Sequence, residues 1–454
     1  MSEIRKTIIF AVAAVALALG AWAASPRQAT PDAFLDRGEL FFPDFEDPNT
    51  AASLEVVEFD GETAEAIPFK VINRGGRWTI PSHHDYPADG EDRLAQTAAG
   101  VIGISKDDFR TSNVSDHESC GVIDPLDEGS TSLRGRGRRV TLRGANEEVL
   151  ADFIVGEEVE DRAGFRFVRI PDQKRVYVAK MEIDISTSFA DWIEKDLLKL
   201  ERSALDQVVL RDYSIDERSG RVSQRDVLIL DREDGSWKAD RMTATQEVDT
   251  TKMNDLLGAI DELSIVGIRP KPEGISRDLK RSSDNLSLSQ TSLLQLQTKG
   301  YYFSRDGSLL SNDGELQART NDGVTYTLRF GEVVYGQGDA ITAGTEASDD
   351  ASAGPGENRY LFITTSFDPA RIPEPKKPLN MEFQDKPEAE WTDADRGNKS
   401  LHDAHEDWRL KVEAARARTA ELNNRFADWY YVISAESFEK MRVKRSDLVT
   451  ARSS

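Results

Sequence analysis

The amino-acid sequence predicts an α+β protein in which two similar modules follow a membrane-anchoring segment at the N-terminus. One pattern of strands, a turn, a tryptophan and an amphipathic helix occurs twice without a gap. Runs that are typical of antiparallel strands follow each copy, and an apolar stretch precedes both. With 454 residues, the chain exceeds the size that one hydrophobic core usually supports, so two or more domains are expected.

The repeated pattern extends over residues 69–104 and again over residues 228–263. Trp78 and Trp237 lie at equivalent places in the two copies, and the offset between the copies is constant at 159 residues, which is 237 − 78. Self-similarity at a fixed spacing is the sequence signature of a repeated structural unit. We therefore expect two modules of like topology, in which each tryptophan is buried between the helix and the sheet of its own module.

Composition and charge restrict the class of protein. Hydrophobic residues make up 39% and charged residues 31% of the chain, which is typical of a globular protein rather than one with many membrane spans. Lys and Arg number 58 against 81 Asp and Glu, so the net charge of −23 would repel nucleic acid, which is not expected as a partner. Cys120 is the only cysteine, which excludes an internal disulfide.

Residues 1–27 are predicted to anchor the chain in the inner membrane. Arg5 and Lys6 precede an apolar run over residues 7–24, whose length is near the lower limit for a single span. These positive charges favour a cytoplasmic N-terminus with the rest of the chain on the extracytoplasmic, periplasmic side. A cleaved signal peptide is the alternative, because residues 21–23 have the small-x-small form of a cleavage site. Both interpretations place the residues beyond about residue 27 outside the cytoplasm.

A linker is expected over residues 28–51, which hold three prolines and several acidic residues. The first α+β module is predicted to extend over residues 52–202. β-Branched and aromatic residues separated by turn residues indicate its antiparallel strands. The expected elements are strands at 54–59, 69–72, 139–142, 149–156, 165–170 and 175–179, a helix at 94–104, and a closing helix through Phe189, Trp192, Ile193 and Leu197.

The second module, residues 203–454, is predicted to repeat this order with longer connections. Its expected elements are strands at 208–210, 227–230, 316–320, 324–330, 360–364 and 429–433, a helix at 253–263, and a closing segment with Phe438 and Met441. A loop rich in Ala, Gly, Ser and Asp at residues 340–358 replaces a short turn of the first module.

The largest departure from the repeat is an insertion at residues 368–427. It begins with four prolines, which favour a stiff extended lead, and continues into a run whose apolar residues alternate spacings of four and three. This spacing predicts one amphipathic helix. Two alternatives follow for the apolar stripe of this helix. Either the stripe packs on the sheet of its own module, or the stripe is a docking surface for a partner protein or a second copy of the chain. The candidate docking residues are Trp408, Val412, Leu422 and Phe426.

Histidines supply the candidate metal ligands. His83 and His84 are adjacent, so on an extended segment their side chains point to opposite sides and do not easily reach one ion. His402 and His405 lie three apart on a predicted helix, which resembles but does not match the spacing of a metalloprotease. No phosphate-binding glycine loop, nucleophile elbow or zinc-binding cysteine pattern occurs in the sequence. The sequence therefore predicts no cofactor, and structural roles are favoured for these histidines.

Four features together carry a family resemblance. They are the N-terminal anchor and the runs at residues 121–126 (GVIDPL), 323–332 (GVTYTLRFGE) and 360–364 (YLFIT). The combination resembles a bacterial envelope family that is catalogued only as a domain of unknown function, DUF4340. Members are typically encoded beside ATP-driven transporters of the gliding-motility type, which implies an accessory role there. The motifs are structural in kind, so the resemblance transfers no catalytic residue.

Two functional classes follow from these observations. In the first, the chain is a membrane-tethered, extracytoplasmic and non-enzymatic accessory protein of an ABC-transporter-associated envelope complex, where it binds envelope proteins or associates with itself. In the alternative, it is an extracytoplasmic metal-dependent hydrolase that uses His83, His84 or the pair of His402 and His405. The anchor, the repeat and the missing enzyme motifs favour the first class.

Overall fold

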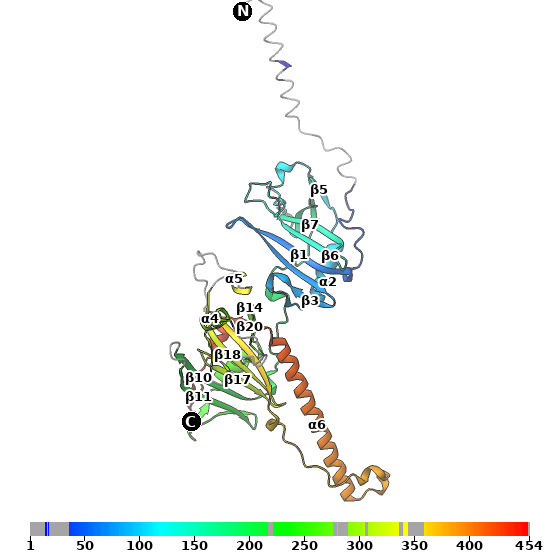
Figure 1. Ribbon diagram of the computed structural model, residues 1–454. Coiled ribbons are helices and arrows are strands. Elements are labelled where there is room, and N and C mark those ends of the chain that lie inside the picture. Colours follow the sequence, from blue (N-terminus) through cyan, green and yellow to red (C-terminus); the bar gives the residue numbers. More distant parts are fainter. Residues whose placement is uncertain are drawn as a thin grey trace, which may run out of the picture. The chain divides into compact units, whose positions relative to one another are not determined.

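The computed structural model of the chain describes residues 14, 15, 17, 36–216, 221–275, 279, 289–304, 307–335, 339–343 and 358–452 (Figure 1). The apolar run that is predicted to anchor the chain lies outside the described residues, apart from Ala14, Val15 and Leu17. The predicted linker up to residue 35 lies outside them as well. Among the described residues, no helix is both long enough and apolar enough to cross a bilayer.

The fold is a mixed α+β arrangement with two large antiparallel sheets, which confirms the α+β part of the prediction. The first sheet has nine strands in the order β4-β3-β2-β1-β6-β7-β8-β9-β5. They are β1 (Ala51–Asp60), β2 (Glu65–Arg74), β3 (Arg77–Ile80), β4 (Tyr86–Pro87), β5 (Asp108–Thr111), β6 (Arg138–Gly144), β7 (Val149–Glu158), β8 (Phe165–Arg169) and β9 (Val176–Lys180).

The second sheet has eight strands in the order β12-β11-β10-β17-β18-β19-β20-β14. They are β10 (Leu205–Asp216), β11 (Arg221–Glu233), β12 (Ser236–Ala239), β14 (Ile265–Pro270), β17 (Glu315–Thr320), β18 (Val324–Val334), β19 (Asn358–Phe367) and β20 (Trp429–Ile433). Two smaller sheets join β13 (Gln246–Val248) to β21 (Val449–Ala451) and β15 (Tyr301–Phe303) to β16 (Leu309–Ser311).

Helices fill the connections between these strands. The α-helices are α2 (Glu91–Ile102), α3 (Thr250–Asp261), α4 (Gln290–Thr298), α5 (Asp339–Thr342), α6 (Asp393–Phe426), α7 (Ala435–Met441) and α8 (Arg445–Leu448). The short 3-10 helices are η2 (Pro48–Thr50), η3 (Pro81–His83), η4 (Val114–Asp116), η5 (Phe189–Asp191), η6 (Arg202–Ala204), η7 (Pro369–Arg371), η8 (Glu382–Asp385) and η9 (Glu388–Glu390).

The chain folds into two compact units. The first unit comprises residues 1–76 and 91–187, and the second unit comprises residues 77–90 and 188–454. The hairpin of β3 and β4 therefore groups with the second unit, whereas the sequence places the boundary between modules after residue 202.

The core of the first unit lies between its sheet and α2. Leu54 and Val56 of β1 are fully buried. Leu94, Ala98 and Val101 follow helical spacing along α2 and are buried as well, because this face of the helix packs on β1. Two acidic residues in the first turn of α2 favour the helix through its dipole. The predicted helix at residues 94–104 thus corresponds to α2, shifted by two to three residues.

Residues 36–50, the described part of the predicted linker, pack against the first unit. Phe41 is buried, and its N–H donates to the carbonyl oxygen of Ile104 at 3.0 Å. The Tyr177 hydroxyl donates to the carboxylate of Asp36 at 2.5 Å. This segment is therefore attached to the first unit before β1 begins.

In the second unit, α3 occupies the place that the sequence predicts for the repeated helix. The Asp249 carboxylate caps its N-terminus by accepting from the N–H groups of Thr251 and Lys252. Such a cap typically stabilises a helix by about 1 kcal/mol. Met253 and Ile260 are buried on the face of α3 that packs against α7.

The predicted closing helix of the first module is wrong. Only η5 forms there, as a single 3-10 turn, although Phe189, Trp192 and Leu197 are all buried. The Trp192 carbonyl accepts from the N–H of Asp89 at 2.8 Å instead of from a helical N–H further along the chain. The apolar spacing reports that these side chains are buried, but the backbone hydrogen bonds of the segment go elsewhere.

Both sheets are assembled in the same order along the chain. Beyond its edge strand β4, the first sheet reads β3-β2-β1-β6-β7-β8-β9-β5, and the second sheet reads β12-β11-β10-β17-β18-β19-β20-β14 from its edge. In each half of the chain, four strands precede a helix: β1 to β4 precede α2, and β10 to β13 precede α3. The strand after that helix, β5 or β14, forms the far edge of the sheet. In the second sheet, α6 is inserted between β19 and β20.

Candidate functional site

A long arm interrupts the repeated order in the second unit. It consists of α6, which is 34 residues long, and of the preceding segment, residues 369–392, which we call the lead. Figure 1 shows α6 running away from the second sheet while the lead runs beside it toward the N-terminus of the helix. At 1.5 Å per residue, α6 is about 50 Å long, so its N-terminal part extends well beyond the strands.

The C-terminal half of α6 packs on β19. Leu422 and Phe426 are each only 3% exposed. The Asn423 side chain accepts from the N–H of Thr365 at 2.9 Å and donates to the Thr365 carbonyl at 2.7 Å. The Thr365 hydroxyl also donates to the carbonyl of Thr419 at 3.1 Å. This half of the helix therefore belongs to the core of the second unit.

The N-terminal half of α6 is covered by the lead. The Trp408 indole N–H donates to the carbonyl of Ile372 at 2.8 Å, and one ring nitrogen of His405 lies 3.1 Å from the Glu374 carboxylate. The bond to His405, followed by the bond to Lys377, lowers the pKa of Glu374. The proline-rich lead is thus bound along the same stripe that the sequence identifies as apolar.

The tip of the arm is fixed by a network around the N-terminus of α6. Thr392 forms a capping box with Asp395, and the Lys386 ammonium lies 3.1 Å from the Asp395 carboxylate. The bonds from the Thr392 hydroxyl and N–H, and then that from Lys386, lower the pKa of Asp395 to about 2. The Asn398 side chain accepts from the N–H of Leu379 at 2.9 Å, which joins the lead to the first turns of the helix.

The tip presents apolar side chains in acidic surroundings. Leu379 is 92% exposed and Met381 is 36% exposed, although the backbone at Leu379 is bonded to the helix. Five exposed carboxylates follow on the same stretch of chain: Glu382, Asp385, Glu388, Glu390 and Asp393. We call residues 378–393 the acidic tip. It combines a fixed backbone, an apolar projection and a strong local negative charge.

The structure places the four candidate docking residues on the covered side of the arm. Leu422 and Phe426 face the second unit's own core, and Trp408 and Val412 are half-buried. Leu379 and Met381 were not identified from the sequence, because they follow Pro378 in a stretch without periodicity. Pattern analysis finds side chains that become buried in a helix, and an exposed leucine in an extended segment leaves no such signal.

The histidines lie in separate structural settings. His83 is 2% exposed, stacks on Phe189 with ring centroids 4.5 Å apart, and has a ring nitrogen 2.9 Å from the Thr342 hydroxyl. His84 bonds to the carbonyl of Ala343, and the ring of His402 packs on Phe383, whereas His405 bonds to the lead. In the described part of the chain, no three His, Cys, Asp or Glu side chains converge as a metal site requires.

The two repeated tryptophans are half-buried, so the expected burial between helix and sheet is only partial. Trp237 lines an open groove of about 1070 Å³ in the second unit. Met253 and Leu257 of α3 line the same groove, together with several cationic side chains. This groove is a second candidate surface, separate from the arm.

Residues 78–280 match a protein family that is described as a domain of unknown function, DUF4340. The matched span begins at Trp78, within β3, and includes Trp237 and both α2 and α3. The arm lies outside it. No curated protein and no solved structure matches the chain.

Proposed function

We propose that this chain is a non-enzymatic accessory protein of the bacterial cell envelope. Residues 1–27 hold it at the inner membrane, with the following residues on the periplasmic side. Its partner is another protein of an ABC-transporter-associated envelope complex, and the arm is the element that docks this partner. The apolar run near the N-terminus, the two positive charges before it and the family resemblance support the location.

The internal organisation of the arm carries the proposal. The N-terminal half of α6 is held to the lead by hydrogen bonds at Trp408, His405 and Asn398. These bonds lie within the arm and add nothing to the hydrophobic core between a helix and a sheet. Ordering a backbone costs about 1–2 kcal/mol of conformational entropy per residue. The N-terminal half of α6 and the lead form an ordered extension that is held mainly by contacts within itself, so it adds little to the stability of the second unit. A role in binding a partner therefore explains this extension better than a role in folding.

The chemistry of the acidic tip supports a particular kind of partner surface. Leu379 and Met381 project from a backbone that is already fixed, which reduces the entropy lost on binding. Five exposed carboxylates follow them on the same stretch of chain, so the complementary surface is an apolar pocket with a basic rim. A membrane surface rich in anionic lipid would repel the tip. We therefore propose a protein partner for this surface.

We also propose that the two sheets are copies of one unit and serve as the scaffold for the arm. Their strand order, which is the same apart from the additional edge strand β4, supports this interpretation, as do equivalent contacts at Gly156 and Gly331. The side chain of Arg166 donates to the Gly156 carbonyl at 3.1 Å, and that of Arg359 donates to the Gly331 carbonyl at 3.3 Å. Equivalent bonds of this kind, at residues far apart in sequence, support a common architecture for both sheets.

Site-specific cross-linking in cells tests the docking role. A photoreactive amino acid replaces Leu379 in the full-length chain, and the matched control places it at Leu294 of α4, which is 61% exposed and lies off the arm. We expect one discrete adduct with an envelope protein from position 379 and no such adduct from position 294. Equal labelling from both positions, or no protein adduct from position 379, would reject the arm as the docking element.

A further inference from the structure

β12 forms one edge of the second sheet, and β11 is its only sheet neighbour among the described strands. The N–H of Asp240 donates to the carbonyl of Ile229 at 2.8 Å, which fixes the alternation of bonds between the two strands. By this alternation, the backbone groups of Trp237 and Ala239 point away from β11. Within the part of the chain that the structure describes, the Ala239 N–H donates to the thioether of Met242 at 3.1 Å, which is a weak acceptor.

The corresponding edge of the first sheet is occupied. β3 stands at the place of β12 in the common strand order, and β4 pairs with its outer side. The carbonyl of Trp78, the residue equivalent to Trp237, accepts from the N–H of Ala88 at 3.0 Å. The structure gives the outward backbone groups of Trp237 no such partner within the described residues. The second sheet therefore lacks a strand that the first sheet has.

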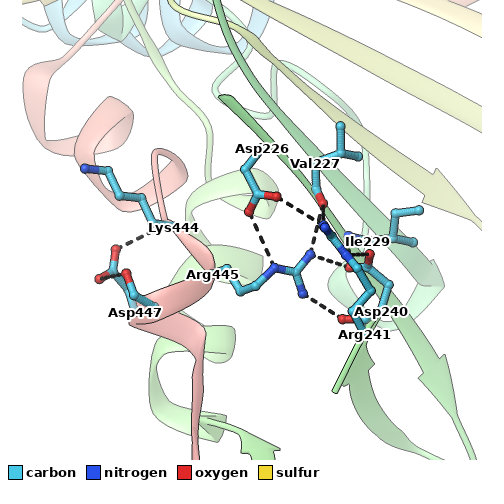
Figure 2. Close-up of polar contacts among 9 residues, drawn as sticks. Asp226, Val227, Ile229, Asp240, Arg241, Lys444, Arg445 and Asp447 are labelled. Atoms are coloured by element: carbon cyan, nitrogen blue, oxygen red, sulfur yellow. Dashed lines mark hydrogen bonds and ion pairs between the residues drawn. The ribbon is translucent and has the colours of Figure 1, made fainter. Parts of the chain in front are cut away.

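The C-terminus of the chain explains why this strand is missing. β13 follows β12 in the chain as β4 follows β3, but it pairs with β21 instead of β12. Figure 2 shows how Arg445, just before β21, is bound to the β11 side of the unit. Its guanidinium donates to the carbonyl of Val227 at 2.9 Å and to the carboxylate of Asp240 at 2.7 Å. The C-terminal segment thus keeps β13 engaged and leaves the edge of β12 open.

The groove along this edge is apolar at its base and cationic at its rim. Trp237 lines it together with Met253 and Leu257 of α3. Its charged lining residues are four cations and one carboxylate: Arg202, Arg232, Lys238, Arg452 and Glu247. This balance is opposite to that of the whole chain, whose net charge is −23.

Arg232 is the cation that is least engaged in the groove. Its side chain donates to the carbonyl of Ser203 at 3.1 Å, and no carboxylate of the described chain lies within ion-pair distance of it. The other three cations have carboxylate neighbours, for example Lys238 with Glu233 at 2.6 Å. An exposed arginine beside an apolar base is suited to bind a carboxylate of a partner.

We infer that the Trp237 groove accepts an extended acidic segment of a partner protein, which adds to the edge of β12 as β4 adds to β3. The outward N–H and carbonyl of Trp237 bond to the backbone of the segment, and the groove base takes an apolar side chain. A carboxylate of the segment pairs with Arg232. Because successive side chains of a strand point to opposite faces, the bound segment should alternate acidic and apolar residues. This site depends neither on the arm nor on the anchor.

A peptide-binding measurement on the purified full-length chain in detergent tests this inference. The probe is a fluorescein-labelled heptapeptide that alternates Glu and Val, and its anisotropy reports binding. We expect saturable binding that Arg232→Glu weakens by about tenfold or more, because charge reversal replaces attraction by repulsion. Arg221→Glu is the matched control, since Arg221 is an exposed arginine at the opposite end of the same strand, and it leaves binding unchanged.

A second probe separates strand pairing from simple charge attraction. It has the same sequence, but alternate backbone nitrogens carry methyl groups, so it cannot donate to the edge of β12. We expect it to bind about tenfold more weakly. Equal binding of both probes, no binding of the first, or no effect of Arg232→Glu would overturn the inference. Self-association that Arg232→Glu removes, without probe binding, would identify a second copy as the occupant and would overturn it as well. Thermal unfolding of both variants checks that they fold.

Discussion

Gly331 lies against the carbonyl oxygen of Lys299 in the same way that Gly156 lies against that of Cys120. A Cβ atom on either glycine would stand 2.3 Å from that oxygen. The N–H of the following glutamate donates to the same carbonyl in both cases, at 2.9 and 3.0 Å. A loop therefore crosses each sheet at an equivalent place, and only glycine permits this approach of two backbones.

Substitution of these glycines is expected to destabilise both units. In Gly156→Ala and Gly331→Ala, the added methyl group meets a carbonyl oxygen that belongs to the backbone and cannot move freely. Overpacking of this kind typically costs about 1–3 kcal/mol of unfolding free energy. Urea unfolding of each variant measures the loss.

A third glycine is the control. Gly397 lies inside α6, and a Cβ there meets nothing within 4 Å. Gly397→Ala should therefore stabilise the helix by about 0.5–1 kcal/mol. If all three alanine variants changed stability alike, the close approach at Gly156 and Gly331 would not be the cause.

Two apolar side chains of α6 are expected to contribute very differently to the unfolding free energy. Phe426→Ala removes a ring that is 3% exposed in the core of the second unit, which typically costs about 3–5 kcal/mol. Leu410→Ala changes a side chain that is 55% exposed on the same helix and should stay within about 0.5 kcal/mol. Thermal unfolding compares the two variants. Equal losses would contradict the assignment of the C-terminal half of α6 to the core.

The sequence predicts those parts of the fold in which burial follows a regular period. The expected helices at 94–104 and 253–263 correspond to α2 and α3, because each buries one face against its own unit. The same spacing near Trp192 predicts a helix that does not form, since the Trp192 carbonyl bonds to Asp89. Periodicity reports which side chains are buried, and it does not specify the partner of each backbone group.

The candidate site was less accessible to sequence analysis. The stripe through Trp408 predicts the helix, but proline-rich segments have no period that would show the lead covering it. The open edge of β12 depends on the pairing of β13 with β21, which are about 200 residues apart in the chain. Pairing over such a separation is specified by tertiary packing, so no local sequence pattern indicates the groove.

The capping network at the tip is expected to respond to pH only in strong acid. Asp395 has a pKa of about 2 in the folded chain against an ordinary value of 3.8. A carboxyl group with a lowered folded pKa stabilises the fold above its unfolded pKa, and this contribution is lost as the pH falls through the folded value. The tip should therefore loosen between about pH 4 and pH 2. A carbon-13 NMR titration of the Asp395 carboxyl measures its midpoint.

The variant Thr392→Ala tests the cause of this shift. The Thr392 hydroxyl makes the largest contribution that lowers the pKa of Asp395, so its removal should raise the midpoint toward 3.8. A midpoint near 3.8 in the unmodified chain, or no change in the variant, would refute the capping arrangement.

Arg445→Ala is expected to release the C-terminal segment before the second unit unfolds. The guanidinium bonds to the carbonyls of Val227 and Asp240 and to two carboxylates, and its loss leaves these acceptors without a common donor. Hydrogen exchange of β21 and β13 should become faster than exchange of β18. Lys440→Ala is the control, because its exposed pair with Glu436 contributes little. Unchanged exchange in β21 would show that Arg445 does not hold the segment.

Co-purification of the cross-linked partner from solubilised membranes tests the docking role of the acidic tip most directly. The double substitution of Leu379 and Met381 by Ser changes exposed side chains, so its unfolding free energy should stay within about 0.5 kcal/mol of the unmodified chain. The matched control, Leu410→Ser, changes an exposed leucine further along the arm. We expect the tip variant to lose the partner and the control to retain it. Retention of the partner by the tip variant, at unchanged stability, would contradict docking through the arm.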